Sequence, residues 1–201
     1  NPKEEMVRIL WGGGSSCSAS TPTVSILHAS AGDPFNYGSL LGSGVSGGYD
    51  LTGDGTTDLV VSDPLTYINN GHKGRVWVIP GEDIIQSERV PITWGADMPG
   101  LDDVQALDIS LYTSTFYGES TNARIGYDVG TLADWSNPQN GLFYVYEANG
   151  IQNSDTHGGG AIWGMTPNGD IDPVPRAVVA GETSAGDFGV FLGVSNQNGI
   201  D

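Results

Sequence analysis

The chain has 201 residues, and its 24 Asp and Glu against 7 Lys and Arg give it a formal net charge of -17. This length allows one ordinary domain with a hydrophobic core. The charge argues against binding to a nucleic-acid backbone or an anionic membrane surface, and no apolar run is long enough to span a bilayer. The single cysteine, Cys17, excludes an internal disulfide and a multi-cysteine metal cluster.

The predicted elements are short strands. The 31 glycines and 11 prolines are spread along the chain and divide it into short segments. No window has sustained helical periodicity, whereas several segments are rich in β-branched and aromatic residues. The predicted strands are residues 7–11, 24–28, 58–61, 76–79, 143–146 and 177–180. The sequence therefore predicts an all-β fold.

A loosely repeated unit recurs along the chain with a period of roughly 65 to 80 residues. Each unit opens with an aromatic residue and glycine, continues into a strand opened by glycine, and has a later strand that ends in Trp-Gly. The opening pairs are Tyr37-Gly38, Tyr117-Gly118 and Phe188-Gly189. The glycine-opened strands are 74–81 and 141–150, and the Trp-Gly strands are 92–95 and 161–164. Because residues 6–13 match the glycine-opened strand, the chain is expected to begin in the middle of a unit.

These motifs resemble the FG-GAP repeat of integrin α-subunit propellers and of many secreted bacterial proteins. The family pattern runs Phe-Gly, a Gly/Ala-rich strand, a calcium loop, Asp-Leu-x-Val-Gly-Ala-Pro and Gly-x-Val-Tyr-Val. Tyr37-Gly38, residues 50–58, residues 58–64 and residues 74–79 fill these places in order. Ser62-Asp63 replaces the family's Gly-Ala pair, a departure that affects the expected turn but not the register.

The resemblance implies propeller blades of four antiparallel strands. We expect the second half of a blade at residues 1–32, a blade with a calcium loop at 33–112, a degenerate blade at 113–182 and the first half of another at 183–201. Propellers generally need about four or more blades to close. These roughly three blade equivalents are therefore expected to belong to a larger propeller, or to complete a ring through strand exchange or association.

The most specific motif is Asp50-Leu-Thr-Gly-Asp-Gly-Thr-Thr-Asp58, in which three carboxylates recur at every fourth position. Carboxylates this close repel one another unless a cation lies between them. Calcium prefers about six to eight oxygen ligands, and the loop's glycines permit the sharp turn that it requires. We predict the side chains of Asp50, Asp54 and Asp58, with the side chain or the carbonyl of Thr52, as Ca²⁺ ligands, and the resemblance adds the backbone carbonyl of Thr56. The ordinary alternative is that Asp-Gly pairs form turns without a metal.

No helix is expected after this loop, because residues 59–64 form a strand that ends in proline. The cation is therefore expected to fix a β-hairpin, in a structural rather than a catalytic role. The next unit has Tyr127-Asp128 in parallel to Tyr49-Asp50, but its later carboxylates are missing or displaced. We expect weak or no calcium binding there.

Several catalytic-looking patterns have ordinary explanations. Residues 42–48 match both G-x-G-x-x-G and G-x-S-x-G, but each motif requires a strand that leads into a helix. We expect instead an inner blade strand with small residues. His28, His72 and His157 lack metal-ligand spacing, and acidic pairs such as Asp102-Asp103 are typical of solvated turns.

Most of the tryptophans recur at strand positions and are predicted to pack between blades. They are Trp11, Trp77, Trp94 and Trp163. Trp135 lies in a predicted loop and is a candidate contact for a protein or glycan ligand.

We expect a calcium-stabilised, noncatalytic propeller module of an extracellular or cell-surface protein, used in adhesion, recognition or structural assembly. The resemblance implies that partners bind loops opposite the calcium hairpins, and further blades or copies of the chain are also expected partners. One alternative is the propeller domain of a secreted hydrolase or lyase acting on polysaccharide, which needs a convergent acid–base pair. Another is an assembly subunit whose unpaired blade edges recruit neighbouring chains.

Overall fold

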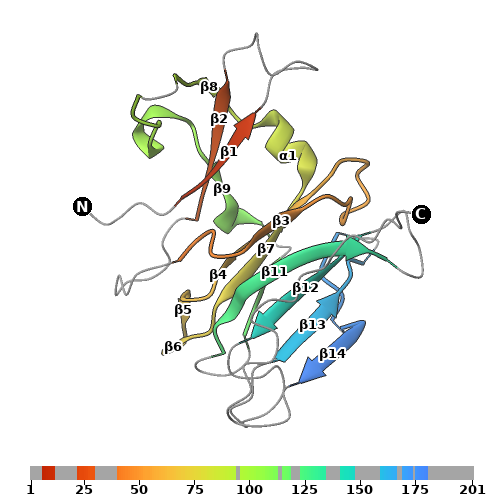
Figure 1. Cartoon of the computed structure of the whole chain (residues 1–201). Coiled ribbons are helices and arrows are strands. Elements are labelled where there is room, and N and C mark those ends of the chain that lie inside the picture. Colours follow the sequence, from red (N-terminus) through yellow and green to blue (C-terminus); the bar gives the residue numbers. More distant parts are fainter. Residues whose placement is uncertain are drawn as a thin grey trace, which may run out of the picture.

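A computed structural model describes residues 6–11, 22–29, 40–93, 96–112, 115–118, 123–134, 141–147, 159–166, 169–173 and 175–180. Over these residues the chain consists mostly of short strands in antiparallel sheets, which confirms the all-β prediction. The strands form three four-stranded sheets and one small two-stranded sheet. Figure 1 shows the three larger sheets next to one another in chain order, a propeller-like arrangement.

The first sheet combines segments that are far apart in the sequence. Strand β1 (Met6–Trp11) pairs antiparallel with β2 (Thr23–His28). Two short strands from later in the chain complete the sheet on β2: β8 (Val90–Pro91), which is antiparallel, and β9 (Leu107–Asp108), which is parallel. The parallel pair departs from the four antiparallel strands expected for a blade.

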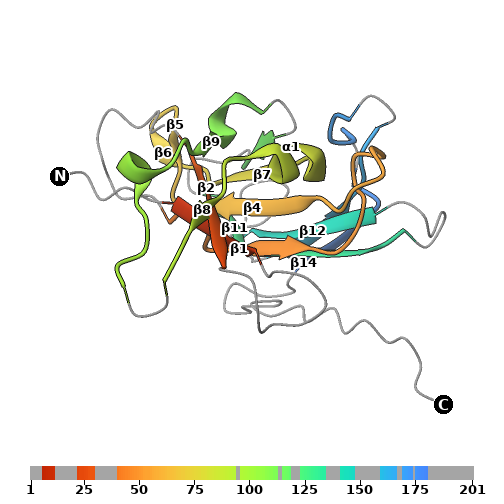
Figure 2. The same ribbon diagram turned by 90° about the horizontal axis from the view of Figure 1, so that it is seen from above.

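The second sheet is a sequential antiparallel array in the order β10-β7-β4-β3. Its strands are β3 (Val45–Gly47), β4 (Leu59–Asp63), β7 (Arg75–Ile79) and β10 (Thr115–Tyr117). The small hairpin of β5 (Tyr67–Ile68) and β6 (Gly71–His72) lies between β4 and β7 in the chain. This hairpin and the β3–β4 loop therefore lie at opposite ends of the second sheet (Figure 2).

The third sheet repeats the same sequential order, β11-β12-β13-β14, and is antiparallel throughout. Its strands are β11 (Ile125–Ala133), β12 (Gly141–Glu147), β13 (Gly159–Trp163) and β14 (Ala177–Ala180). The predicted strands at 143–146 and 177–180 lie in this sheet.

The boundary between the second and third sheets differs by one strand from the boundary between the repeated units expected from the sequence. Tyr117 was expected to open a new unit, but it lies in β10, the last strand of the second sheet. The expected Trp-Gly strand at 92–95 is preceded by Val90–Pro91, which pairs with the first sheet rather than the second. The boundaries at 33–112 and 113–182 remain a prediction.

Three short helical segments occur in the described residues: α1 (Gly81–Gln86), η1 (Leu101–Asp103) and η2 (Ile109–Leu111). None was predicted, because six residues or fewer are too short to show helical periodicity. Helix α1 begins directly after Pro80, at the end of β7. Glu82 and Asp83 lie in its first turn, where the helix dipole favours acidic side chains.

Two hydrophobic cores lie between the sheets, because alternate residues of β4 and β7 face opposite sides. Val61, Trp77 and Ile79 pack with Leu27 and Ile109 on the side of the first sheet. On the side of the third sheet, the buried residues are Leu51, Val60, Val76, Val78, Ala123, Ile125, Val129, Phe143 and Val145. Burial on both faces explains the continuous apolar runs of β4 and β7.

The tryptophan prediction is confirmed at the positions that the structure describes. Trp77 is 1% exposed within the core between the first and second sheets. Trp11 packs against the same core, and Trp163 packs against the core between the second and third sheets. Trp94 and Trp135 lie outside the described residues.

Small residues bring the second and third sheets into close contact. A Cβ atom at Gly44 would lie 2.7 Å from Ser62 Oγ and 2.8 Å from a methyl carbon of Val129. Ser62 and Asp63, which replace the family's Gly-Ala pair, both form hydrogen bonds. The Ser62 hydroxyl donates to the carbonyl oxygen of Gly126, and Asp63 Oδ1 accepts bonds from the amides of Leu40 and Leu65. The register of β4 is as predicted, and β3 leads into a loop rather than a helix.

Candidate metal centre

The candidate metal centre is the loop between β3 and β4. The amide of Asp58 donates a 2.9 Å bond to the carbonyl oxygen of Tyr49, which closes the loop at the base of an antiparallel hairpin. Gly53 and Gly55 have φ angles of 81° and 88°, and no atom lies within 4 Å of a Cβ built on either residue. Glycine is thus required here by the left-handed backbone and not by lack of space.

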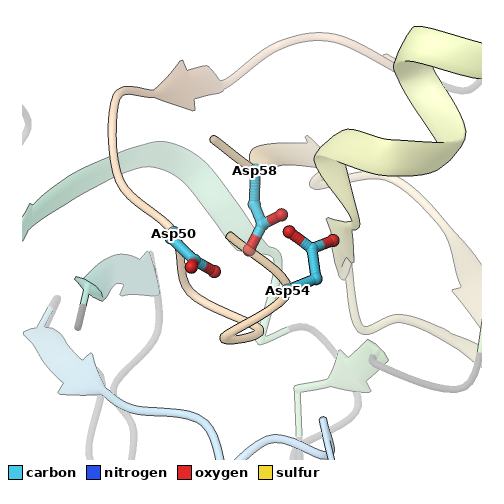
Figure 3. A group of neighbouring side chains, drawn as sticks. All are labelled: Asp50, Asp54 and Asp58. Carbon is cyan, nitrogen blue, oxygen red and sulfur yellow. The ribbon is translucent and has the colours of Figure 1, made fainter. Parts of the chain in front are cut away.

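The loop brings three carboxylates together. One carboxylate oxygen from each of Asp50, Asp54 and Asp58 lies within 4.8 Å of the other two. Figure 3 shows the carboxylates directed toward a common space. Asp54 is exposed, Asp50 is partly buried and Asp58 is only 1% exposed. The cluster is therefore open to solvent on the side of Asp54 and closed on the side of Asp58.

Backbone amides of the loop orient the two outer carboxylates. Asp50 Oδ1 accepts a 2.6 Å bond from the Gly53 amide, and Asp50 Oδ2 accepts a 2.8 Å bond from the Gly55 amide. Asp54 Oδ1 accepts bonds from both the amide and the hydroxyl of Thr56. Burial raises the pKa of Asp54, but hydrogen bonds from Thr56 and the Glu82 amide outweigh it, so this pKa lies below its ordinary value.

Asp58 is held from two elements. Its Oδ2 accepts bonds of 2.7 Å and 2.6 Å from the amides of Leu51 and Thr52, and its Oδ1 accepts a 2.8 Å bond from the amide of Gly81, the first residue of α1. Burial raises the pKa of Asp58, and these amide bonds offset only part of that increase. Sequence reasoning missed the role of Gly81, although the Pro80-Gly81 pair does mark a break after a strand.

The Thr52 hydroxyl oxygen is buried and has no hydrogen-bond partner. It lies beside the carboxylates of Asp54 and Asp58 without a well-formed hydrogen bond to either. An unpartnered buried oxygen beside three carboxylates gives an all-oxygen donor set, which hard divalent cations prefer. The residues present fit such a cation.

No cationic side chain of the described residues is paired with the carboxylates of the loop. Among the described residues, the structure shows no ion pair from Asp50, Asp54 or Asp58 to a Lys or Arg side chain, whereas Arg176 pairs with Asp172. Two like charges about 5 Å apart repel by roughly 3 kcal/mol at an effective dielectric constant of about 20. A cation would remove this repulsion. The full ligand set of Asp50, Thr52, Asp54, Thr56 and Asp58 remains a prediction.

The third sheet does not repeat this centre in its described residues. Among the described residues, the carboxylates of Asp50, Asp54 and Asp58 are the one group of three metal-ligating side chains that lie close together, and none of them comes from the third sheet. The parallel drawn between Tyr127-Asp128 and Tyr49-Asp50 is wrong. Asp128 lies within β11, where its carboxylate accepts a 2.9 Å bond from the Tyr144 hydroxyl. Weak or absent calcium binding in this unit remains a prediction, since residues 135–140 lie outside the described part.

Other residues singled out in the sequence have structural roles or lie outside the described ranges. Asp103 accepts a 2.9 Å bond from the Gly100 amide, as expected for a turn. Ser46 of the G-x-S-x-G match hydrogen-bonds to Thr131 of β11, which is a contact between sheets. The positions outside the described residues are Cys17, Tyr37-Gly38, His157 and 183–201.

Comparison with known proteins agrees with this architecture. No helix in the described residues is long and apolar enough to cross a membrane. No curated protein matches the chain. Residues 41–79 match the FG-GAP repeat family, and this span runs through β3, the acidic loop, β4, the β5–β6 hairpin and β7. Residues 41–79 are thus similar to an FG-GAP repeat, and the mostly antiparallel sheets are consistent with a β-propeller-like fold.

Proposed function

We propose that this chain is a calcium-stabilised, noncatalytic propeller module of an extracellular or cell-surface protein, with a role in adhesion, recognition or structural assembly. One observation carries the proposal. Three carboxylates meet within 4.8 Å, beside a buried and unpartnered Thr52 hydroxyl, and no cationic side chain of the described residues pairs with them. The match to the FG-GAP repeat covers this same loop.

Calcium would contribute two positive charges and a preference for oxygen ligands. Asp50, Asp54, Asp58 and the Thr52 hydroxyl, with the Thr56 carbonyl implied by resemblance, would hold it. The chain's own contribution is to aim these groups before the ion arrives. Backbone amides hold the Asp50 and Asp58 carboxylates, which lowers the cost of ordering these side chains on binding.

A structural role is supported by how the described carboxylates are used. Asp63 and Asp103 accept bonds from backbone amides, Asp108 accepts bonds from Ser110, and Asp83 accepts a bond from the Tyr112 hydroxyl. These groups hold turns and inter-element contacts. Partners would be a protein or glycan ligand, together with further blades or copies of the chain.

Isothermal titration with calcium tests the proposal. The wild-type protein should bind one ion per loop, with a dissociation constant on the order of 10⁻⁴ to 10⁻³ M or tighter, as in extracellular modules. Asp54→Asn should weaken binding at least about tenfold, because it removes a charged ligand from the open side. Asp102→Asn, an exposed carboxylate in η1, should bind like wild type. Equal binding by all three proteins, or none by the wild type, would contradict the proposal.

The alternative of an enzyme acting on polysaccharide has its own assay. Calcium-loaded protein is incubated with acidic and neutral polysaccharides, and new reducing ends are measured. The noncatalytic proposal predicts no turnover above that of heat-denatured protein. Turnover that is abolished by a single carboxylate substitution would replace it with the enzyme.

A further inference from the structure

The first residue of β12, Gly141, lies directly against the acidic loop of the neighbouring sheet. Its amide donates a 3.0 Å bond to the carbonyl oxygen of Asp50. A Cβ atom at Gly141 would lie 2.4 Å from Leu51 Cδ2 and 2.6 Å from Tyr49 Cβ. No side chain fits at this position unless the loop moves away.

Leu51 connects this contact to the carboxylates. Its side chain is 4% exposed and belongs to the core between the second and third sheets, with Val129, Phe143 and Val145. Its amide donates a 2.7 Å bond to Asp58 Oδ2. The third sheet therefore packs against the side chain of Leu51, and a hydrogen bond links the Leu51 amide to Asp58, a candidate metal ligand.

Two effects therefore act on the position of the segment Tyr49, Asp50 and Leu51. Packing against β12 fixes their backbone and apolar side chains. Repulsion among the carboxylates opposes that placement as long as no cation is present. A cation held by the loop would remove the repulsion and favour the position in which Gly141 and Asp50 are bonded.

We propose that cation binding by the acidic loop and docking of the third sheet onto the second are energetically coupled. The inference rests on the proposed function, because it assigns a regulatory consequence to that same loop. Coupling of this kind is reciprocal: the ion tightens the contact between the sheets, and an intact contact raises the affinity for the ion. Calcium concentration then sets the cohesion between adjacent sheets.

A substitution in the third sheet that removes no candidate ligand tests the reciprocal effect. Gly141→Ala should push Tyr49 and Leu51 away and weaken calcium binding by about tenfold, within the usual range of coupling between sites. Gly100→Ala is the matched control. Its added methyl group would meet only Asp103 Oδ2, at 3.8 Å, which is an ordinary contact. Its calcium affinity should stay within about twofold of wild type.

Amide hydrogen exchange of the wild-type protein provides a second readout that needs no variant. Calcium should slow exchange of the Gly141 amide and of its neighbours in β12 by about tenfold or more, while amides of β2 in the first sheet change little. The same measurement on Asp54→Asn should need at least about tenfold more calcium to slow exchange by the same amount. If Gly141→Ala does not fold, the wild-type exchange data decide.

The outcomes separate the two proposals. A wild-type protein that binds no calcium contradicts the proposed function. A wild-type protein that binds calcium without slowing exchange at Gly141 overturns the coupling and leaves the proposed function standing. The same conclusion follows if a folded Gly141→Ala variant keeps wild-type calcium affinity.

Discussion

The hydroxyl of Ser62 donates a 2.6 Å hydrogen bond to the carbonyl oxygen of Gly126, and this bond joins the second sheet to the third. Ser62 is fully buried, and its oxygen also accepts a 3.0 Å bond from the Gly44 amide. A polar residue thus lies at the centre of a contact that is otherwise formed by glycines and aliphatic side chains.

Ser62→Ala should lower the free energy of unfolding by about 1–3 kcal/mol, because it leaves a buried carbonyl and a buried amide without this partner. Urea denaturation measures the change. Ser43→Ala removes an exposed hydroxyl on the same hairpin and should change stability by less than about 0.5 kcal/mol. Equal stability of the two variants would show that the inter-sheet bond contributes nothing.

Gly81→Ala tests the contact between α1 and the acidic loop. A Cβ atom at Gly81 would lie 2.2 Å from the Thr57 carbonyl oxygen and 2.7 Å from Thr56 Oγ1. The helix must shift away and lose its bond to Asp58, which should destabilise the protein by roughly 1–3 kcal/mol. Thermal denaturation of this variant beside Gly100→Ala measures the loss. Wild-type stability of Gly81→Ala would mean that α1 adapts freely.

The free energy of unfolding should fall at alkaline pH because of the Tyr144 hydroxyl. Burial, with the bond to Asp128, raises the pKa of Tyr144 well above its ordinary value of 10.0. Because the folded-state pKa exceeds the unfolded one, this contribution to stability is complete below pH 10.0 and is lost as pH rises toward the folded-state pKa. The loss should be at most about 1.4 kcal/mol per pH unit.

Tyr144→Phe removes this titrating group and should flatten the fall in unfolding free energy above pH 10.0. Urea denaturation from pH 8 to 11 compares the two slopes. Tyr112 carries the same kind of shift, caused by burial and by Asp83, so a Tyr112→Phe variant should flatten the curve independently. Parallel curves for wild type and Tyr144→Phe would show that Tyr144 titrates alike in both states.

Removal of calcium should lower the thermal midpoint. An ion that binds only the folded state stabilises it by about 2.7 kcal/mol at a concentration of 100 times the dissociation constant. For a chain of this size that corresponds to a shift of roughly 5–10 °C. Differential scanning calorimetry with calcium and with EDTA measures it. Magnesium should give a smaller shift, because it requires near-octahedral geometry. Asp54→Asn should show a clearly smaller calcium shift than the wild type at the same calcium concentration.

The strands and the acidic loop could be predicted because their signals are local. Asp50, Asp54 and Asp58 lie within nine residues, and the apolar run of β4 follows at once. The strand at 76–79 was predicted from its composition, and the FG-GAP pattern placed it in the same repeat as the acidic loop; both predictions are confirmed.

Pairing at a distance was not predictable from these local patterns. Strand β8 has only two residues, one of them proline, and nothing in Val90–Pro91 indicates a return to the first sheet. Gly141 was read as the opening of a strand, and its contact with Leu51 depends on how two sheets pack. Tyr127-Asp128 resembled Tyr49-Asp50 in sequence, but strand pairing sets its place in the sheet.

A structure of the protein crystallised with millimolar calcium tests the central claim most directly. The account predicts an anomalous peak about 2.3–2.6 Å from carboxylate oxygens of Asp50, Asp54 and Asp58, with Thr52 among the surrounding ligands. Water alone at this position, with the loop unchanged at saturating calcium, would contradict it.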